Sequence, residues 1–331
     1  MSELKSVGII GTGMYVPEKV MTNFDLEKIV ETSDEWIKSR TGISERRIAS
    51  ENEASSDLAV KAAERALEDA GVSPEEIDLV IVATITPDFA FPATAALVQH
   101  KIGAKNAAAF DLEAACTGLI YGIAAGSNFI ATGMYKKVLV IGSEALSKIM
   151  DWEDRNTCVL FGDGASAVLL GEVEKGDGII SYHLAADGSG GDTLDMPGGG
   201  SRNPASEETV KNKMHCLRMK GQEVFKFAIT ALPETVIKTL EKAEISTDKI
   251  KMIVPHQANY RIIGSAAKRL SMDVDKFYMN MDRYGNTSSA SIGIALDEAV
   301  KAGKIVKGDY IVLVGFGAGL TYGSCLIKWS K

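Results

Sequence analysis

The sequence predicts an α/β protein built from two similar halves. Its 331 residues exceed the size at which one hydrophobic core usually stops growing, so two domains or two fused halves are expected. Short apolar runs rich in β-branched residues alternate with amphipathic stretches, which is typical of buried strands between helices. One segment also recurs after about half the chain, as the duplication of an α/β unit requires.

Four apolar runs are the expected strands, and one long amphipathic stretch is an expected helix. The runs are IDLVIVAT (77–84), KKVLVIG (136–142), IKMIVP (250–255) and DYIVLVGF (309–316). The helix is SDLAVKAAERALEDAG, residues 56–71. We expect it to end at Gly71, because glycine readily adopts the left-handed conformation that closes a helix.

The recurring segment occurs at residues 67–78 and again at residues 240–251, an offset of 173. LEDAGVSPEEID and LEKAEISTDKIK share five identities in twelve aligned residues, and an expected strand follows each copy. Five matches alone carry little weight, but the offset is about half the chain. We therefore expect two halves, at roughly 1–175 and 176–331.

Composition and charge narrow the classes of partner. A formal net charge of −8 disfavours nonspecific nucleic-acid binding, which depends on Lys and Arg. The amino-terminal segment has only a four-residue apolar run, too short for a secretion signal or a membrane span. A cytoplasmic protein without membrane insertion is expected. The four cysteines and four histidines show no metal-ligand or disulfide spacing, so we expect no metal site.

Cys116 is the first candidate for chemistry. It lies in DLEAACTGLIYGIAAG, residues 111–126, before an expected helix whose Gly118, Gly122 and Gly126 recur every four residues. These glycines would allow close packing against a neighbour. The start of a helix favours a thiolate and can hold an oxyanion through its unpaired N–H groups. Free cysteine is also a common buried packing residue, so from spacing alone both interpretations stay open.

His256 and Asn286 are polar residues at comparable turns. His256 follows the expected strand 250–255, and ligands of α/β sheets collect beyond the carboxyl ends of strands. Asn286 lies three residues from position 289, where the offset of 173 places the counterpart of Cys116, so both look like strand-to-helix turns. Simpler interpretations are a capping histidine and an N-cap asparagine. Together the three would form a set used by thiol acyl-transfer sites.

The segment after His256 is basic. Residues 257–272 contain Arg261, Lys268 and Arg269 and no acidic residue. A local charge of +3 on an acidic chain suggests an acidic partner, and a solvated helix face is the alternative. The glycine-rich tracts at 8–13, 162–171 and 315–319 do not open helices, so no dinucleotide cofactor is expected.

Seven motifs resemble those of β-ketoacyl-[acyl-carrier-protein] synthase III, a family of condensing enzymes in the thiolase superfamily. In family order they are GTGMYVP (11–17), TSDEWIKSRTGISERR (32–47), AACTG (114–118), EDRNTCVLFGDGA (153–165), PHQAN (255–259), YGNTSSAS (284–291) and GFGAGLTYGS (315–324). The resemblance covers nearly the whole chain. It implies a thiolase-like duplicated α/β unit, layered α/β/α/β/α with two central buried helices, in a homodimer.

The resemblance also implies an activity. Cys116 would take the acyl group of an acyl-CoA, and malonyl-acyl carrier protein would then enter. His256 and Asn286 would donate hydrogen bonds to its thioester oxygen as decarboxylation builds enolate charge. A Claisen condensation would release CO2 and give a 3-oxoacyl carrier protein, which initiates fatty-acid synthesis. The resemblance implies no cofactor, because the CoA thioester is a substrate.

Binding residues follow from the same resemblance. Backbone N–H groups of Cys116 and Ala318 would form the oxyanion hole, although the family commonly has glycine at position 318. The adenine of CoA would stack between Trp36 and Arg155, with Arg40 near the phosphates.

The resemblance implies two further contacts. The carrier protein would bind Arg261, Lys268 and Arg269. Phe91, reaching across the dimer interface, and Phe316 would line the acyl pocket. Whether the primer is acetyl, branched or longer stays open, because it depends on packing around Phe91 and on the Gly- and Ser-rich segment 186–217, which we expect to be a mobile loop system.

Three alternatives remain at this point. A polyketide-type starter synthase of the same superfamily shares the three residue types. A papain-like cysteine hydrolase also orders Cys, His and Asn in this way, and the 140 residues between Cys116 and His256 fit it. A relative that binds carrier protein without turnover is the third.

Overall fold

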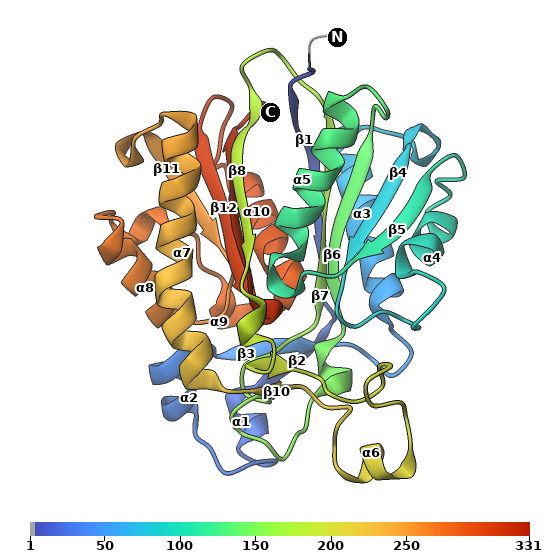
Figure 1. Ribbon diagram of the computed structural model, residues 1–331, viewed down its shortest axis with the longest axis vertical. Helices are drawn as coiled ribbons and strands as arrows, with labels where there is room; N and C mark the ends of the chain where they lie inside the picture. Colours follow the sequence, from blue (N-terminus) through green and yellow to red (C-terminus); the bar gives the residue numbers. More distant parts are fainter. Residues whose placement is uncertain (1–3) are drawn as a thin grey trace.

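The computed structural model describes residues 4–331 and arranges them in five layers (Figure 1). The first sheet has the strand order β1-β7-β6-β4-β5 and the second has the order β11-β12-β13-β8. The first sheet consists of β1 (Val7–Tyr15), β4 (Leu79–Ala83), β5 (Ala108–Leu112), β6 (Val138–Glu144) and β7 (Gly164–Glu172). The second consists of β8 (Gly178–Ala186), β11 (Ile250–Pro255), β12 (Tyr310–Gly317) and β13 (Thr321–Lys328). The predicted halves and their boundary near residue 175 stay a prediction.

Helices separate the two sheets and cover their outer faces (Figure 1). Between the sheets lie α5 (Gly118–Ala131) and α10 (Ser291–Lys301). The outer helices are α3 (Ser55–Ala70) and α4 (Thr94–Lys101) on the first sheet, and α7 (Gly221–Ala243) and α8 (Tyr260–Arg269) on the second. The order of layers is therefore the expected α/β/α/β/α with two central helices.

The smaller elements gather at one end of the layers, where α5 begins (Figure 1). They are β2 (Lys19–Thr22), α1 (Asn23–Leu26), α2 (Asp34–Thr41), β3 (Glu45–Ile48), β9 (Leu194–Asp195), α6 (Glu207–Lys211), β10 (Arg218–Met219) and α9 (Met281–Tyr284). The segment expected to be a mobile loop system at 186–217 thus contains β9 and α6, and β9 pairs with β10.

The predicted strands and helix are confirmed with small shifts of their ends. The four apolar runs become β4, β6, β11 and β12, and residues 56–71 become α3. Gly71 ends α3 with a φ of 63°, in the left-handed region that glycine adopts without strain. β6 extends two residues beyond the predicted run, to Glu144.

The glycines of α5 allow it to lie close to the first sheet. A Cβ at Gly122 would lie 2.6 Å from Val140 Cγ1, and one at Gly118 would lie 2.8 Å from Ala83 Cβ. Protein interiors are packed as densely as organic crystals, so no side chain fits at these contacts. The expected close packing is confirmed, and it holds the start of α5 at the carboxyl end of β4 and against the middle of β6.

The offset of 173 is visible in the backbone at the two central turns. Residues 115–117 and 288–290 are both short 3-10 helices, and α5 and α10 begin directly after them. Ala115 and Ser288, which the offset pairs, have φ values of 45° and 46°. One expectation was wrong: Asn286 does not follow a strand, because helix α9 ends at Tyr284.

Candidate active site

Cys116 lies in the 3-10 turn that leads into α5. Its side chain is buried, and the neighbouring Thr117 hydroxyl lies 2.8 Å from Thr321 Oγ1 at the start of β13. A Cβ on Gly317 would lie 2.7 Å from Cys116 N, so only glycine allows the end of β12 to pass here. Ala318, the next residue, is half-buried. Backbone from the second sheet therefore comes within contact distance of the Cys116 N–H.

The Cys116 thiol is protonated at neutral pH. Burial raises its pKa to about 12, and the Ser288 hydroxyl beside it lowers the pKa by less. A helix start normally favours the thiolate, but here removal from water outweighs that effect. Attack by this thiol therefore requires a proton acceptor.

His256 is fixed at the end of β11. It is 2% exposed, and its Nδ1 lies 2.7 Å from Ser291 Oγ. The Gln257 N–H donates to the same oxygen at 3.4 Å. We assign the Ser291 hydroxyl proton to His256 Nδ1, the arrangement that leaves the ring proton on Nε2. Burial lowers the pKa of His256 to about 3, so the ring is neutral and presents an N–H donor.

Asn286 is held by backbone hydrogen bonds on both sides. Its N–H donates to the Leu160 carbonyl at 2.9 Å, and its carbonyl accepts from Gly162 N–H at 3.0 Å. Its Oδ1 accepts from Ser288 N–H at 2.8 Å. Because the side-chain oxygen is occupied, the amide NH2 is the group that remains for a ligand.

The three predicted residues meet around the start of α10. Ser291, its first residue, contacts His256, whereas Ser288 in the preceding turn lies beside the Cys116 thiol and bonds Asn286. The His256 and Phe316 rings pack edge to face with centroids 5.4 Å apart. A buried thiol, an imidazole N–H and an amide NH2 thus belong to one interlocked group of turns.

The sequence analysis missed Glu144. This residue ends β6, is fully buried, and accepts hydrogen bonds from Ser289 Oγ and Thr86 Oγ1, each at 2.8 Å. Burial raises its pKa to about 7. A signal was available, because an acidic residue two positions after an expected strand lies at the carboxyl edge of the sheet.

The predicted CoA residues come together at α2, which carries Trp36 and Arg40, while Arg155 reaches them from the loop before β7. The Arg40 guanidinium carbon lies 4.8 Å from the Trp36 ring centroid, and that of Arg155 lies 5.6 Å from it. Arg155 also donates to the Glu31 carbonyl at 3.1 Å. An indole beside two guanidinium groups is a suitable surface for a planar base with phosphates.

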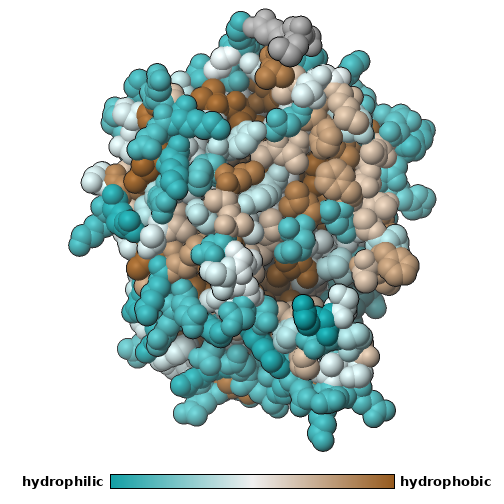
Figure 2. All heavy atoms as spheres, viewed as in Figure 1, coloured by the Kyte–Doolittle hydropathy of each residue, from teal (hydrophilic) through white to brown (hydrophobic). Residues whose placement is uncertain are grey.

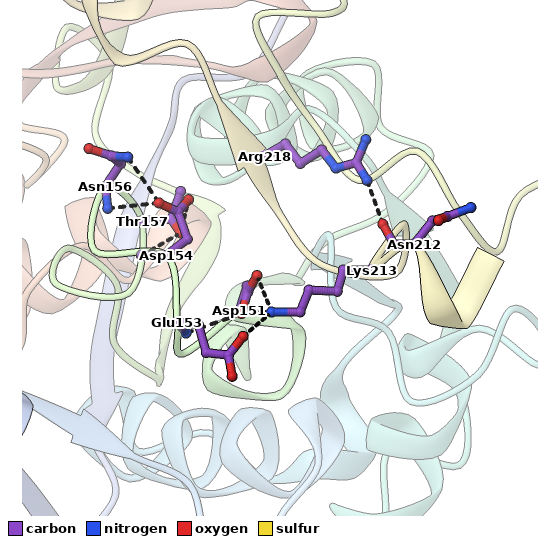
Figure 3. A network of polar contacts seen from close by, with 8 residues as sticks. All are labelled: Asp151, Glu153, Asp154, Asn156, Thr157, Asn212, Lys213 and Arg218. Carbon is purple, nitrogen blue, oxygen red and sulfur yellow. Dashed lines mark hydrogen bonds and ion pairs between the residues drawn. The ribbon is translucent and has the colours of Figure 1, made fainter. Parts of the chain in front are cut away.

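Ion pairs tie the loop that carries Arg155 to the segment after α6 (Figure 3). Lys213 bonds Asp151 at 2.9 Å and Glu153 at 2.5 Å. Asp154 Oδ2 accepts from the Thr157 hydroxyl at 2.9 Å within the same loop. Exposed pairs of this kind contribute only about 0–1 kcal/mol each, so they orient the loop more than they stabilise the fold.

The predicted carrier-protein residues lie on α8. Arg261, Lys268 and Arg269 are all exposed, and Arg269 also donates to the Ile229 carbonyl of α7 at 3.0 Å. Asn259, which caps α8, also donates from its side chain to the Arg40 carbonyl at 2.9 Å. The basic helix and the predicted CoA helix are therefore neighbours.

The two predicted acyl-pocket residues differ in burial. Phe316 is buried beside His256, whereas Phe91 is 86% exposed. Within a single chain Phe91 does not line a buried pocket, so its place in the acyl pocket stays a prediction.

The described residues, 4–331, contain no group of three or more His, Cys, Asp or Glu side chains placed to hold a metal ion. No helix in that range has the length and apolar character needed to cross a membrane.

Comparison with known proteins identifies the family. Residues 110–188 match the model of 3-oxoacyl-[acyl-carrier-protein] synthase III, and residues 240–329 match the model of its C-terminal part. A β-ketoacyl-[acyl-carrier-protein] synthase III of Desulfitobacterium hafniense is 60% identical over 326 residues, which are 98% of each chain. The chain belongs to the 3-oxoacyl-[acyl-carrier-protein] synthase III family.

Solved structures agree with this family. The synthase III of Aquifex aeolicus superposes with a TM-score of 0.90 at 48% identity, covering 98% of this chain and 100% of that one. The priming β-ketosynthase of the R1128 polyketide pathway gives 0.91 at 34% identity, covering 99% and 97%. The thiolase-like fold and the acyltransferase class are thus confirmed, and the papain-like hydrolase is excluded.

Proposed function

We propose that this synthase III moves an acyl group from acyl-CoA to Cys116 and condenses it with malonyl-acyl carrier protein. The observation that carries the proposal is the meeting of a buried thiol, a neutral imidazole N–H and a free amide NH2 around the start of α10. The thiol is a nucleophile, and the imidazole N–H and the amide NH2 are hydrogen-bond donors. A decarboxylating condensation needs these three groups. The products are a 3-oxoacyl carrier protein, CoA and CO2.

The acyl transfer uses the turn at Cys116. The thiolate attacks the thioester carbonyl, and the Cys116 and Ala318 N–H groups receive the negative charge that develops on its oxygen. The glycine at position 317 supports this assignment because it lets the β12 backbone come close to Cys116 N. Ala318 retains the N–H that glycine would offer. Fixed donors aimed at developing charge stabilise the transition state more than the ground state.

The condensation uses His256 and Asn286. CO2 leaves the malonyl group, and the electron pair forms an enolate whose oxygen accepts from His256 Nε2–H and the Asn286 amide. The enolate carbon then attacks the acyl-Cys116 carbonyl, and Cys116 leaves as a thiolate. A neutral His256 suits this role because Ser291 directs its proton to Nε2.

Substrates approach from the end of the molecule where α2 and α8 lie. Trp36, Arg40 and Arg155 would hold the nucleotide of CoA, and no metal or redox cofactor takes part. Arg261, Lys268 and Arg269 would attract the acidic carrier protein. The bond between Asn259 and Arg40 supports a shared entrance for both partners.

We also propose that the enzyme is a homodimer that forms along β5. β5 is the outermost strand of the first sheet, and its residues are only partly buried. Apolar side chains gather over the region of β4, β5 and α5 (Figure 2). An uncovered strand edge and an apolar patch are features of a protein interface, and Phe91 would cross it to the partner's pocket. The cytoplasmic location stays a prediction.

The test is condensation with purified malonyl-acyl carrier protein. Wild-type enzyme with acetyl-CoA should release CO2 and increase the carrier protein's mass to that of its 3-oxoacyl form, whereas Cys116→Ala should form no condensation product. Cys325→Ala is the matched control, since that buried cysteine lies in β13. Product formation by Cys116→Ala would refute the proposal. Repeated condensation, or use of malonyl-CoA, would favour the polyketide-type alternative.

A further inference from the structure

Glu144 lies near Cys116 and is surrounded by hydroxyl groups. Its Oε1 accepts from Ser289 Oγ, and its Oε2 accepts from Thr86 Oγ1, both at 2.8 Å. The Ile85 N–H lies 3.2 Å from Oε2. A buried carboxyl surrounded by donors can hold a negative charge, yet its raised pKa leaves it ready to accept a proton.

Ser288 belongs to a turn that packs against both groups. Residues 288–290 contact the turn 115–117, which carries Cys116, and strand β6, which ends at Glu144. The Ser288 hydroxyl is buried and, among the residues the structure describes, completes no hydrogen bond; it lowers the pKa of Cys116 and the pKa of Glu144. Ser288 holds this position with a left-handed φ of 46°, a conformation that costs a non-glycine residue about 1–2 kcal/mol. Strain of this kind persists where the surrounding structure imposes it.

The other obvious base is occupied. His256 Nδ1 receives the Ser291 hydroxyl, and its Nε2 carries the proton that the enolate needs. Its lowered pKa makes it a poor proton acceptor from a thiol. The chemistry of the first half-reaction therefore lacks an acceptor among the three predicted residues.

We propose that Glu144 accepts the Cys116 thiol proton through the Ser288 hydroxyl during acyl transfer. The proton passes from Sγ to Ser288 Oγ while the Ser288 proton passes to the Glu144 carboxylate. The Sγ electron pair forms the bond to the acyl carbon, and the bond from that carbon to the CoA sulfur breaks. The proton then returns by the same path to the departing CoA sulfur, so CoA leaves as a thiol and Glu144 is again a carboxylate. This proposal rests on the acyl transfer to Cys116 proposed above.

The groups around Glu144 determine how the rate of Cys116 acylation depends on pH. The end of β4 presents Thr84, Thr86 and the Ile85 N–H, and the turn before α10 presents Ser288 and Ser289. The 3-10 turn before α5 presents the Cys116 thiol, whose pKa the Glu144 charge raises. The carboxylate is the active form, so acylation should slow as the pH falls through about 7.

The test follows the acylation of Cys116 by intact-protein mass after rapid mixing with acetyl-CoA, from pH 5.5 to 8.5. Wild-type rates should rise through pH 7. Glu144→Gln should acylate about 100- to 10,000-fold more slowly at pH 7.5, the usual range of a lost general base, and its rate should not rise through pH 7. Once the Glu144→Gln variant has been fully acylated by long incubation, it should release CO2 from malonyl-acyl carrier protein at the wild-type rate.

Asp163→Asn is the matched control. Asp163 is also a buried carboxyl with a raised pKa, and it bonds Ala49 N–H and the Ser147 hydroxyl rather than the thiol's neighbours. This variant should keep the wild-type pH profile even if it is less stable. If Glu144→Gln does not fold, Ser288→Ala must show the same slow, pH-independent acylation. If folded Glu144→Gln or Ser288→Ala keeps the wild-type dependence of acylation rate on pH, the inference is overturned. If the wild-type enzyme is not acylated at all, the proposed function itself is overturned.

Discussion

At the scale of single residues, the site depends on groups that fix the orientation of the predicted ones. Cys116, His256 and Asn286 were predicted because residue type and position at expected turns are visible in the sequence. Ser291 was not, because its bond to His256 joins segments 35 residues apart. Glu144 was missed because the predicted strand ended two residues before it.

The Ser291 hydroxyl should matter for condensation but not for acylation. Ser291→Ala removes the donor to His256 Nδ1 and frees the ring to place its proton on either nitrogen. We expect CO2 release from malonyl-acyl carrier protein to fall about 10-fold, equivalent to a lost hydrogen bond of about 1.4 kcal/mol, while the rate of Cys116 acylation is unchanged.

Ser324→Ala serves as the comparison for this variant. Ser324 is equally buried, but its hydroxyl bonds Thr239 on α7, away from the reacting groups. It should lower the unfolding temperature without changing CO2 release. Equal loss of acylation and CO2 release in Ser291→Ala would contradict the positioning role.

At the scale of secondary structure, the spacing of glycines in α5 predicted its packing correctly. The turn before α10 was predicted less well. A strand was expected to precede Asn286, whereas α9 does, and the backbone pairing with residues 160–162 holds the turn in place of a strand. That pairing joins segments more than 120 residues apart, so no local pattern announces it.

Two glycine substitutions test the packing of α5. Gly122→Ala should lower the free energy of unfolding by about 1–3 kcal/mol, because its Cβ would overlap Val140, despite a gain in helix propensity of about 1 kcal/mol. At Gly264 in α8, an added Cβ meets no atom within 4 Å, so Gly264→Ala should raise the free energy of unfolding by about 0.5–1 kcal/mol. Urea unfolding at one protein concentration measures both, and an unchanged or stabilised Gly122→Ala would contradict the packing account.

At the scale of the whole molecule, the active site is shared between the two sheets. The first sheet and α5 provide Cys116 and Glu144, and the second sheet and α10 provide His256, Asn286 and the backbone at Gly317. The two equivalent turns, 115–117 and 288–290, contact each other, and the proposed nucleophile and donors are divided between the two sides of this contact. The repeat in the sequence predicted this arrangement in outline, but not the bonds that cross between the copies.

The central claim is that Cys116 carries the acyl group, and intact-protein mass spectrometry tests it directly. Wild-type enzyme incubated with a mixture of acyl-CoAs should gain one acyl group per chain, located on the peptide that contains Cys116, and the mass gained identifies the preferred primer. Cys116→Ala should gain none. An acyl group on another residue, or no adduct on folded wild-type enzyme, would contradict the account.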